Sequence, residues 1–118
     1  MIQIRENIND VAEFNLLYDS VGWGAYDKKI IGYGRLIGDG ICFMYIQDVM
    51  VIPEYQNRKI GTLIMEKLIS KINKMQERNS DMRTYLGASK GKEKFYEKFG
   101  FITRIDAGLG SGMILKNK

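Results

Sequence analysis

The segment YIQDVMVIPEYQNRKIGT, residues 45–62, decides how this chain folds. Residues 45–52 are mostly apolar and predict a buried strand that ends at Pro53, because proline has no N–H for a sheet ladder. A periodic helix follows the segment. A strand, a short polar turn and a helix in this order present free backbone N–H groups at the helix N-terminus, where an anion is stabilised. Arg58 and Lys59 add two cations at the same place.

The helix expected over residues 57–78 carries one apolar stripe with Lys and Glu opposite. The stripe consists of Ile60, Leu63, Ile64, Leu68, Ile69, Ile72 and Met75. Residues 83–88 predict a strand that pairs in parallel with residues 45–52 after a helical crossover. Residues 30–37 and 41–52 predict a hairpin joined by the turn Gly38-Asp39-Gly40. Because both hairpin strands are apolar on both faces, we expect helices to cover the sheet on both sides.

The two ends of the chain predict further elements around this centre. Residues 1–5 alternate and predict a short strand. Asn9 is a helix N-cap candidate, and a helix is expected from there to about residue 21, since apolar residues recur at helical spacing. Residues 91–99 predict a second amphipathic helix that ends at Gly100, and residues 101–105 and 113–115 predict terminal strands. Trp23 is expected to pack in the core or in a lid. Together these elements indicate a mixed α/β sheet.

Length and composition set bounds on the class of protein. The chain has 118 residues, which predicts one domain over residues 1–118, with 45% hydrophobic and 27% charged residues. No apolar run approaches the ~20 residues of a membrane helix, and no signal-peptide core is present, so we expect a cytoplasmic protein. The net charge of +4 suits a polyanionic cofactor as well as nucleic acid. Cys42 is the only cysteine, expected to be buried, and the chain has no histidine, which excludes Ser-His and Cys-His pairs.

Two motifs make the chain similar to the GNAT superfamily of N-acetyltransferases. Residues 56–61 resemble the family's acetyl-CoA pyrophosphate loop, with Lys59 at the position of its first glycine. FYEKFGF at residues 95–101 resembles the segment Phe-Tyr-Glu-Lys-x-Gly-Phe of the same family. The resemblance extends from Tyr26 to Phe101 and implies a GNAT-like mixed, largely antiparallel sheet. Only residues 7–25 are available for the two helices that the family places there, so this helical region is expected to be shortened.

The resemblance also implies acetyl-CoA as the cofactor. It assigns the backbone of Val49, Met50 and Val51 to the pantetheine arm, and the pyrophosphate to Gln56, Asn57, Arg58, Lys59, Ile60, Gly61 and Thr62. Ser89 stands where the family has an asparagine and Lys92 where a small residue is common; each is expected either to contact the cofactor or to be an ordinary surface residue. The alternative for the loop is a simple helix-start cap. Since lysine lacks the freedom of glycine, we predict a helical or extended backbone at Lys59.

Candidates for proton transfer are few. Tyr96 matches the tyrosine that the family uses to protonate the departing thiolate, and a phenol of pKa ~10 stays protonated at neutral pH. Its alternative is a core aromatic beside Phe95 and Phe99. Asp48 lies in the central strand, where an unpaired charge is costly, so a buried aspartate would hold a proton readily, as a general base needs. A buried hydrogen-bonding carboxylate is an equal alternative for Asp48, and Glu54 or a water molecule are other bases.

The function that the resemblance implies is transfer of an acetyl group from acetyl-CoA to a primary amine of a small molecule, in a ternary complex and without a metal ion. A covalent acyl-enzyme is disfavoured because no histidine is available to activate Cys42. Two other classes stay open. A CoA-binding domain without transferase activity fits the short N-terminal region, and a basic nucleic-acid-binding domain is suggested by charge alone. We expect neither nucleic acid nor a membrane as a partner, and a homodimer is left open.

Overall fold

The computed structural model describes residues 2–9, 12–20 and 28–117, with side chains from residue 31 onward. The chain divides into two compact units. The sheet unit is Met1–Leu86, and the C-terminal unit is Gly87–Lys118.

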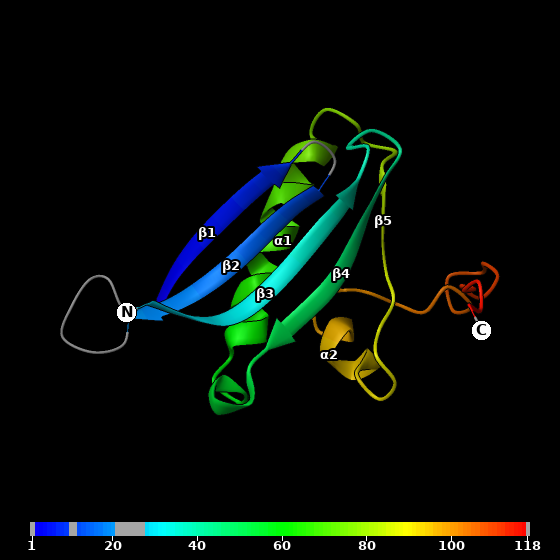
Figure 1. Ribbon diagram of the computed structural model, residues 1–118. Coiled ribbons are helices and arrows are strands. Elements are labelled where there is room, and N and C mark those ends of the chain that lie inside the picture. Colours follow the sequence, from blue (N-terminus) through cyan, green and yellow to red (C-terminus); the bar gives the residue numbers. More distant parts are fainter. Residues whose placement is uncertain (1, 10–11, 21–27, 118) are drawn as a thin grey trace. The chain divides into compact units, whose positions relative to one another are not determined.

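The sheet unit is built on strands that follow one another in space as they do in the sequence, in the order β1-β2-β3-β4-β5 (Figure 1). They are β1 (Ile2–Asn9), β2 (Ala12–Ser20), β3 (Lys28–Gly38), β4 (Phe43–Val51) and β5 (Arg83–Leu86). Neighbouring strands are antiparallel except β4 and β5, which are parallel. The predicted mixed and largely antiparallel sheet is therefore confirmed.

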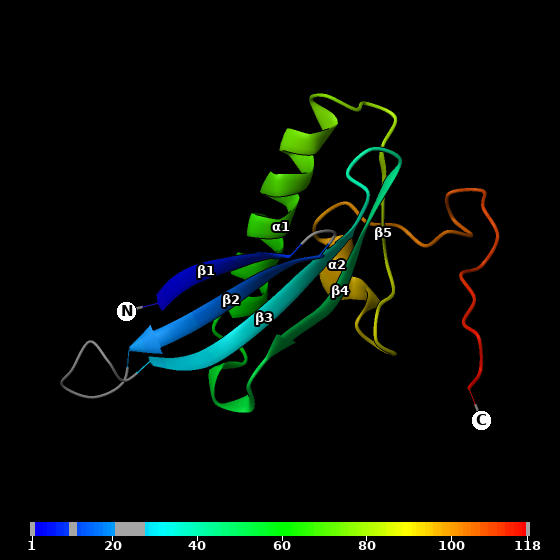
Figure 2. The same ribbon diagram turned by 45° about the horizontal axis from the view of Figure 1, so that its top comes forward.

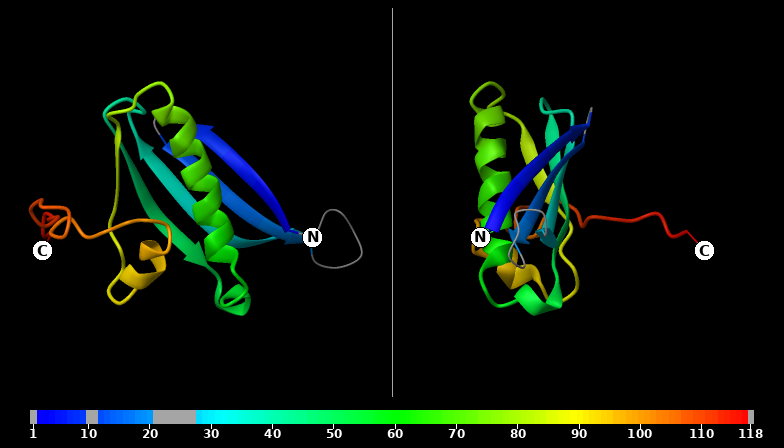
Figure 3. Two further views of the ribbon diagram at one scale, coloured as in Figure 1. Left: turned by 180° about the vertical axis from the view of Figure 1, so that it is seen from behind. Right: turned by 60° about the vertical axis from the view of Figure 1, so that its left-hand side comes forward.

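Helix α1 (Ile60–Gln76) connects β4 to β5 and packs on one face of the sheet (Figures 2 and 3). This is the predicted parallel crossover. The residues that α1 buries are Ile60, Ile64, Met65, Leu68 and Ile72. The buried apolar residues of β3 and β4 are Ile31, Leu36, Met44 and Ile46. Gly34 of β3 permits the close approach, because a Cβ atom there would lie 2.5 Å from Cγ2 of Ile64.

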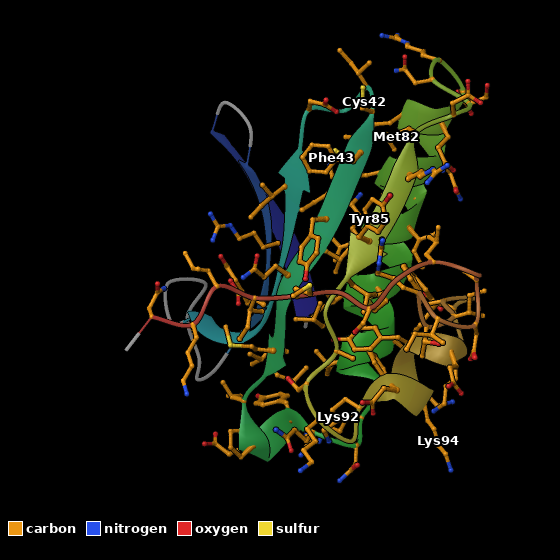
Figure 4. The ribbon with its side chains drawn as sticks, turned by 90° about the vertical axis from the view of Figure 1, so that its right-hand side faces the viewer. Cys42, Phe43, Met82, Tyr85, Lys92 and Lys94 are labelled. Carbon is orange, nitrogen blue, oxygen red and sulfur yellow. The ribbon has the colours of Figure 1, made fainter. Side chains whose placement is uncertain are left out.

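The β3–β4 turn has the residue chemistry expected of it. The carboxylate of Asp39 accepts hydrogen bonds from the backbone N–H groups of Ile41, Cys42 and Phe43 at 2.8, 2.8 and 3.1 Å. These bonds hold the pKa of Asp39 below its ordinary value, because they stabilise the charged form. The predicted hairpin and turn are confirmed, and Cys42 lies in the turn, exposed rather than buried as expected (Figure 4).

The helix predicted from Asn9 to residue 21 is wrong, because residues 12–20 form β2. Residues 13–16 also alternate polar and apolar, so a period of two competes with the helical spacing. Strands β1 and β3 pair with β2 on both sides and satisfy its backbone groups, which outweighs a local helical preference. Trp23 lies outside the described residues.

In the described part of the sheet unit one α-helix, α1, covers one face of the sheet. The expectation that helices cover both faces stays a prediction, because α2 belongs to the other unit. On the face away from α1, Phe43 is 43% exposed. Phe43 and Tyr85 lie on the neighbouring strands β4 and β5 (Figure 4). The sheet unit thus presents a face with large aromatic side chains.

The C-terminal unit contains a shorter helix than predicted, α2 (Glu93–Glu97). Gly100 follows it with φ 93° and donates its N–H to Glu97, as a helix-stop glycine does. The strands predicted at residues 101–105 and 113–115 are wrong. The N–H groups of Ala107 and Leu109 donate to the carbonyls of Thr103 and Arg104. These local bonds form turns, whereas a strand would donate to a neighbouring extended segment.

Candidate active site

Strand β4 parts from β5 halfway along its length. The two strands pair only from Phe43 to Ile46, whereas pairing of β4 with β3 continues to Val51. The backbone of Val49, Met50 and Val51 therefore has a strand neighbour on its β3 side and none of β5 on the other. Such an edge presents N–H and C=O groups to a ligand that binds as an added strand.

A β-bulge lies at the point where the strands part. The register between β3 and β4 shifts between Tyr33 and Arg35, and Asp48 has φ 58°. The predicted burial of Asp48 is wrong, because its side chain is 42% exposed and forms an ion pair with Arg35, Nη1 to Oδ2, at 3.8 Å. The bulge takes Asp48 out of the regular alternation of the strand, and this explains why its side chain is exposed.

The loop between β4 and α1 begins with a 3₁₀ turn, Pro53–Tyr55. The side chain of Gln56 donates from Nε2 to the carbonyl of Val51 at 3.0 Å, so it ties the loop to the end of β4. The guanidinium of Arg58 lies over the ring of Tyr55, 4.9 Å from its centroid. Asn57, Arg58 and Lys59 are exposed, and the loop therefore offers two cations to solvent.

The backbone prediction at Lys59 is wrong. Lys59 has φ 62° and ψ 21°, a left-handed conformation, and Asn57 has φ 64°. The chain must reverse sharply between the 3₁₀ turn and α1, and these two residues make the reversal. Lys59 thus takes a conformation that suits the glycine of the family's loop, which lysine was expected to avoid.

The start of α1 carries N–H groups that helical bonding does not use. The first intrahelical bond runs from Leu63 N to the carbonyl of Lys59 at 3.1 Å, and no described side chain caps the helix. The N–H groups of Ile60, Gly61 and Thr62 precede that bond, at the positive end of the helix dipole. The geometry suits a phosphate at this end, next to the cations of Arg58 and Lys59.

In the C-terminal unit, Ser89 and Lys92 are exposed and lie in the turn before α2, where Lys92 N donates to the carbonyl of Ser89 at 2.9 Å (Figure 4). Tyr96 is half-buried, and its ring stands edge-on to Phe95 with centroids 5.1 Å apart. Burial raises the pKa of Tyr96 above its ordinary value, because it disfavours the phenolate. Tyr96 is therefore part of an aromatic cluster, and its hydroxyl keeps its proton at neutral pH.

Two residues of β3, Tyr33 and Arg35, were not predicted from the sequence to belong to the site. Arg35 joins Asp48, and the pKa of Tyr33 is raised, chiefly by burial, with the charge of Arg35 lowering it and that of Asp48 raising it. Both stand between glycines or apolar residues on a strand, so the alternating pattern marks them as facing away from Gly32 and Gly34. The sequence alone does not give the register between β3 and β4 that places β4 beside Tyr33 and Arg35.

The described residues contain no group of three or more His, Cys, Asp or Glu side chains arranged to hold a metal ion. No helix among them has the length and apolar character needed to span a bilayer.

Comparison with known proteins places these features in one family. Residues 18–103 match the model of the acetyltransferase (GNAT) domain. A GCN5-related N-acetyltransferase of Arabidopsis thaliana, described as chloroplastic, is 30% identical over 106 residues, which are 85% of this chain. This chain spans about half the length, 50%, of that relative.

Solved structures show the same fold. A probable acetyltransferase of Staphylococcus aureus, described as a protein of unknown function, superposes with a TM-score of 0.79 at 25% identity, over 99% of this chain and 100% of the other. A GNAT-family protein of Streptococcus pneumoniae superposes with a TM-score of 0.71 at 20% identity, over 100% and 99% of the two chains.

Proposed function

This chain belongs to the GNAT acetyltransferase family, and on that premise we propose that it transfers the acetyl group of acetyl-CoA to the primary amine of a small molecule. The observation that carries the proposal is the arrangement along one stretch of chain. The open edge of β4 at Val49–Val51 leads within a few residues to the N–H groups at the start of α1. An elongated cofactor with a peptide-like arm and a pyrophosphate needs these two features in this order.

Acetyl-CoA would be held by backbone more than by side chains. The pantetheine amides pair with Val49, Met50 and Val51, and the pyrophosphate accepts hydrogen bonds from Ile60, Gly61 and Thr62. Arg58 and Lys59 lie at the rim and attract the anion over a distance, so their contribution depends on salt. Gln56 positions the loop through its bond to Val51. Ser89 and Lys92 are proposed as further cofactor contacts on the strength of the family pattern.

The transfer step is proposed as a direct attack. The amine loses a proton to Asp48, directly or through water, and its nitrogen forms a bond to the thioester carbon. The C–S bond breaks, and the thiolate takes a proton from Tyr96, which recovers one from solvent. The role of Tyr96 rests on its motif and on its protonated state. The family match extends over residues 18–103, which include both Asp48 and Tyr96.

A CoA-binding domain without turnover is the second candidate, since the described N-terminal region contains strands where the family has helices that wall the acceptor site. Nucleic-acid binding has no observation in its favour beyond charge. A cytoplasmic location and a homodimer remain predictions.

The test combines binding with turnover. Acetyl-CoA should raise the melting temperature, because a ligand bound only to the folded state stabilises it by mass action. Free CoA should be released when an amine panel is added, and Tyr96→Phe should lower kcat by about 10²–10⁴-fold while acetyl-CoA affinity is kept. Binding without CoA release from any amine favours the second candidate. If millimolar acetyl-CoA does not change the melting temperature, both candidate functions are contradicted.

A further inference from the structure

An acidic and a basic side chain stand next to each other on the sheet face that α1 does not cover. Within β3, Gly34 faces α1, since a Cβ there would meet Ile64 and Leu68, and Leu36 is fully buried. Arg35 lies between them and so points to the opposite face. The bulge of β4 brings Asp48 to the same face, with Nη1 of Arg35 and Oδ2 of Asp48 3.8 Å apart.

Stability alone is a weak reason for this pair. The side chains are 34% and 42% exposed, and an exposed ion pair adds little to folding. The separation is also longer than a direct charge-assisted hydrogen bond. Asp48 also has φ 58°, in the left-handed region, which aspartate enters more readily than most residues but which is uncommon within a strand. An uncommon backbone conformation that presents an exposed charge pair points to a functional use.

The position of the pair relative to the open edge of β4 indicates what that use is. Asp48 directly precedes Val49–Val51, the segment to which the proposed function assigns the cofactor arm. Tyr33 lies two residues before Arg35 on the same strand and feels both charges. A polar site with one anion, one cation and a phenol therefore adjoins the place where the acyl group would lie. A ligand that complements it carries a cation and an anion a short distance apart.

We propose that Asp48 and Arg35 bind the two charged ends of a zwitterionic acceptor, so that the substrate is an amino acid. Its ammonium group lies against Asp48, which takes one proton before the nitrogen attacks, and the second proton leaves to solvent after the C–N bond forms. Its carboxylate lies against Arg35, whose fork of N–H donors matches a carboxylate. Because the two side chains are close together, the carboxylate must be near the amine nitrogen. Polyamines and arylalkylamines carry the ammonium group but no carboxylate, so they have no group for Arg35 to bind. This inference rests on the proposed acetyl transfer.

The test compares matched acceptors that differ only in the acid group. Each L-amino acid is assayed beside its carboxamide, the amine that results from its decarboxylation, and its aminophosphonate analogue, with wild-type protein and acetyl-CoA. We expect kcat/KM to be higher for at least one amino acid than for its carboxamide and amine by about 5-fold, the upper end of what an exposed charge pair contributes. In Arg35→Gln this selectivity ratio should fall by a similar factor, and Arg35→Lys should restore part of it.

Arg83→Gln is the matched control, because it removes an exposed arginine from β5 of the same sheet and should leave the ratio unchanged. If Arg35→Gln fails to fold, the amino-acid-induced rise in melting temperature of the wild-type acetyl-CoA complex, compared with that of the carboxamide, replaces it. Acetylation of amines without a carboxylate as efficiently as amino acids, preference for the phosphonate, or an unchanged ratio in Arg35→Gln would overturn the inference while leaving acetyl transfer intact. Absence of transfer to every acceptor would overturn the proposed function itself, and the inference with it.

Discussion

Replacing Lys59 by glycine should stabilise the protein, although it removes a charged side chain from a proposed binding loop. Lys59 holds φ 62° and ψ 21° at the start of α1. For an L-residue this conformation costs about 1–2 kcal/mol relative to the right-handed one. Glycine avoids that strain but loses more freedom on folding, which offsets about 0.5–1 kcal/mol. The net expectation is a gain of about 0.5–1 kcal/mol in the free energy of unfolding, from the difference of these two effects.

For a chain of this size the gain corresponds to a rise in melting temperature of about 2–4 °C. The assay is urea unfolding followed by circular dichroism, with a thermal scan beside it. Lys59→Ala is the first control, since it removes the same charge but keeps the strained conformation. Asn57→Gly is the second control, because asparagine tolerates a left-handed backbone better than lysine does, and its gain should be smaller.

The same variants separate backbone from charge in cofactor binding. Both Lys59→Gly and Lys59→Ala lose the cation, so any difference in their affinity for acetyl-CoA reports the backbone alone. We expect the glycine variant to bind at least as tightly as the alanine variant. A glycine variant no more stable than Lys59→Ala would refute the strain argument, since glycine then relieves nothing at this position.

Three further predictions test the packing, the loop and the turn. Gly34→Ala should lower the free energy of unfolding by about 1–3 kcal/mol through overpacking under α1, while Gly110→Ala, with no atom within 4 Å of its added Cβ, should change it little in the same urea titration. Arg58→Ala should weaken acetyl-CoA binding a few-fold at low salt and less at high salt in calorimetry, because the charge is exposed; equal loss at both would contradict a screened role. The folded pKa of Asp39 is lowered, so its stabilisation is present above the unfolded pKa of ~3.9 and is lost as pH falls through the folded value. The stability difference between wild type and Asp39→Ala should shrink on acidification, and a constant difference would exclude the carboxylate as its cause.

Much of the sheet unit was predictable because its signals are strong and local. Pro53 marks the end of β4, the apolar stripe from Ile60 to Met75 marks α1, and Asp39 between two glycines marks the hairpin turn. These signals depend on neighbours in the sequence, so the crossover could be predicted without knowing what it packs against. The proposed cofactor segments, Val49–Val51 and residues 56–62, were named from the resemblance to the family motifs.

The errors share a different origin, which is long-range pairing. Residues 12–20 carry a helical spacing and an alternating one together, and only the strands on either side select the second. The register shift that turns Asp48 toward Arg35 also belongs to two strands at once, so the ion pair could not be derived from β4 alone. At Lys59 the residue type was a poor guide, because the conformation is imposed by the reversal of the chain between β4 and α1.

The strained positions of the described residues coincide with the proposed site. The non-glycine residues there with positive φ are Asp48, Asn57 and Lys59, and all of them fall in the twelve-residue span from the bulge of β4 to the start of α1. Each carries a conformational cost that simple sheet and helix packing does not require. At Asp48 the strain brings a carboxylate beside Arg35 and coincides with the end of pairing to β5. At Lys59 it begins a helix whose first N–H groups stay available for an anion. This concentration of uncommon backbone conformations supports the proposed site independently of the family motifs, because a pre-organised site requires a constrained backbone.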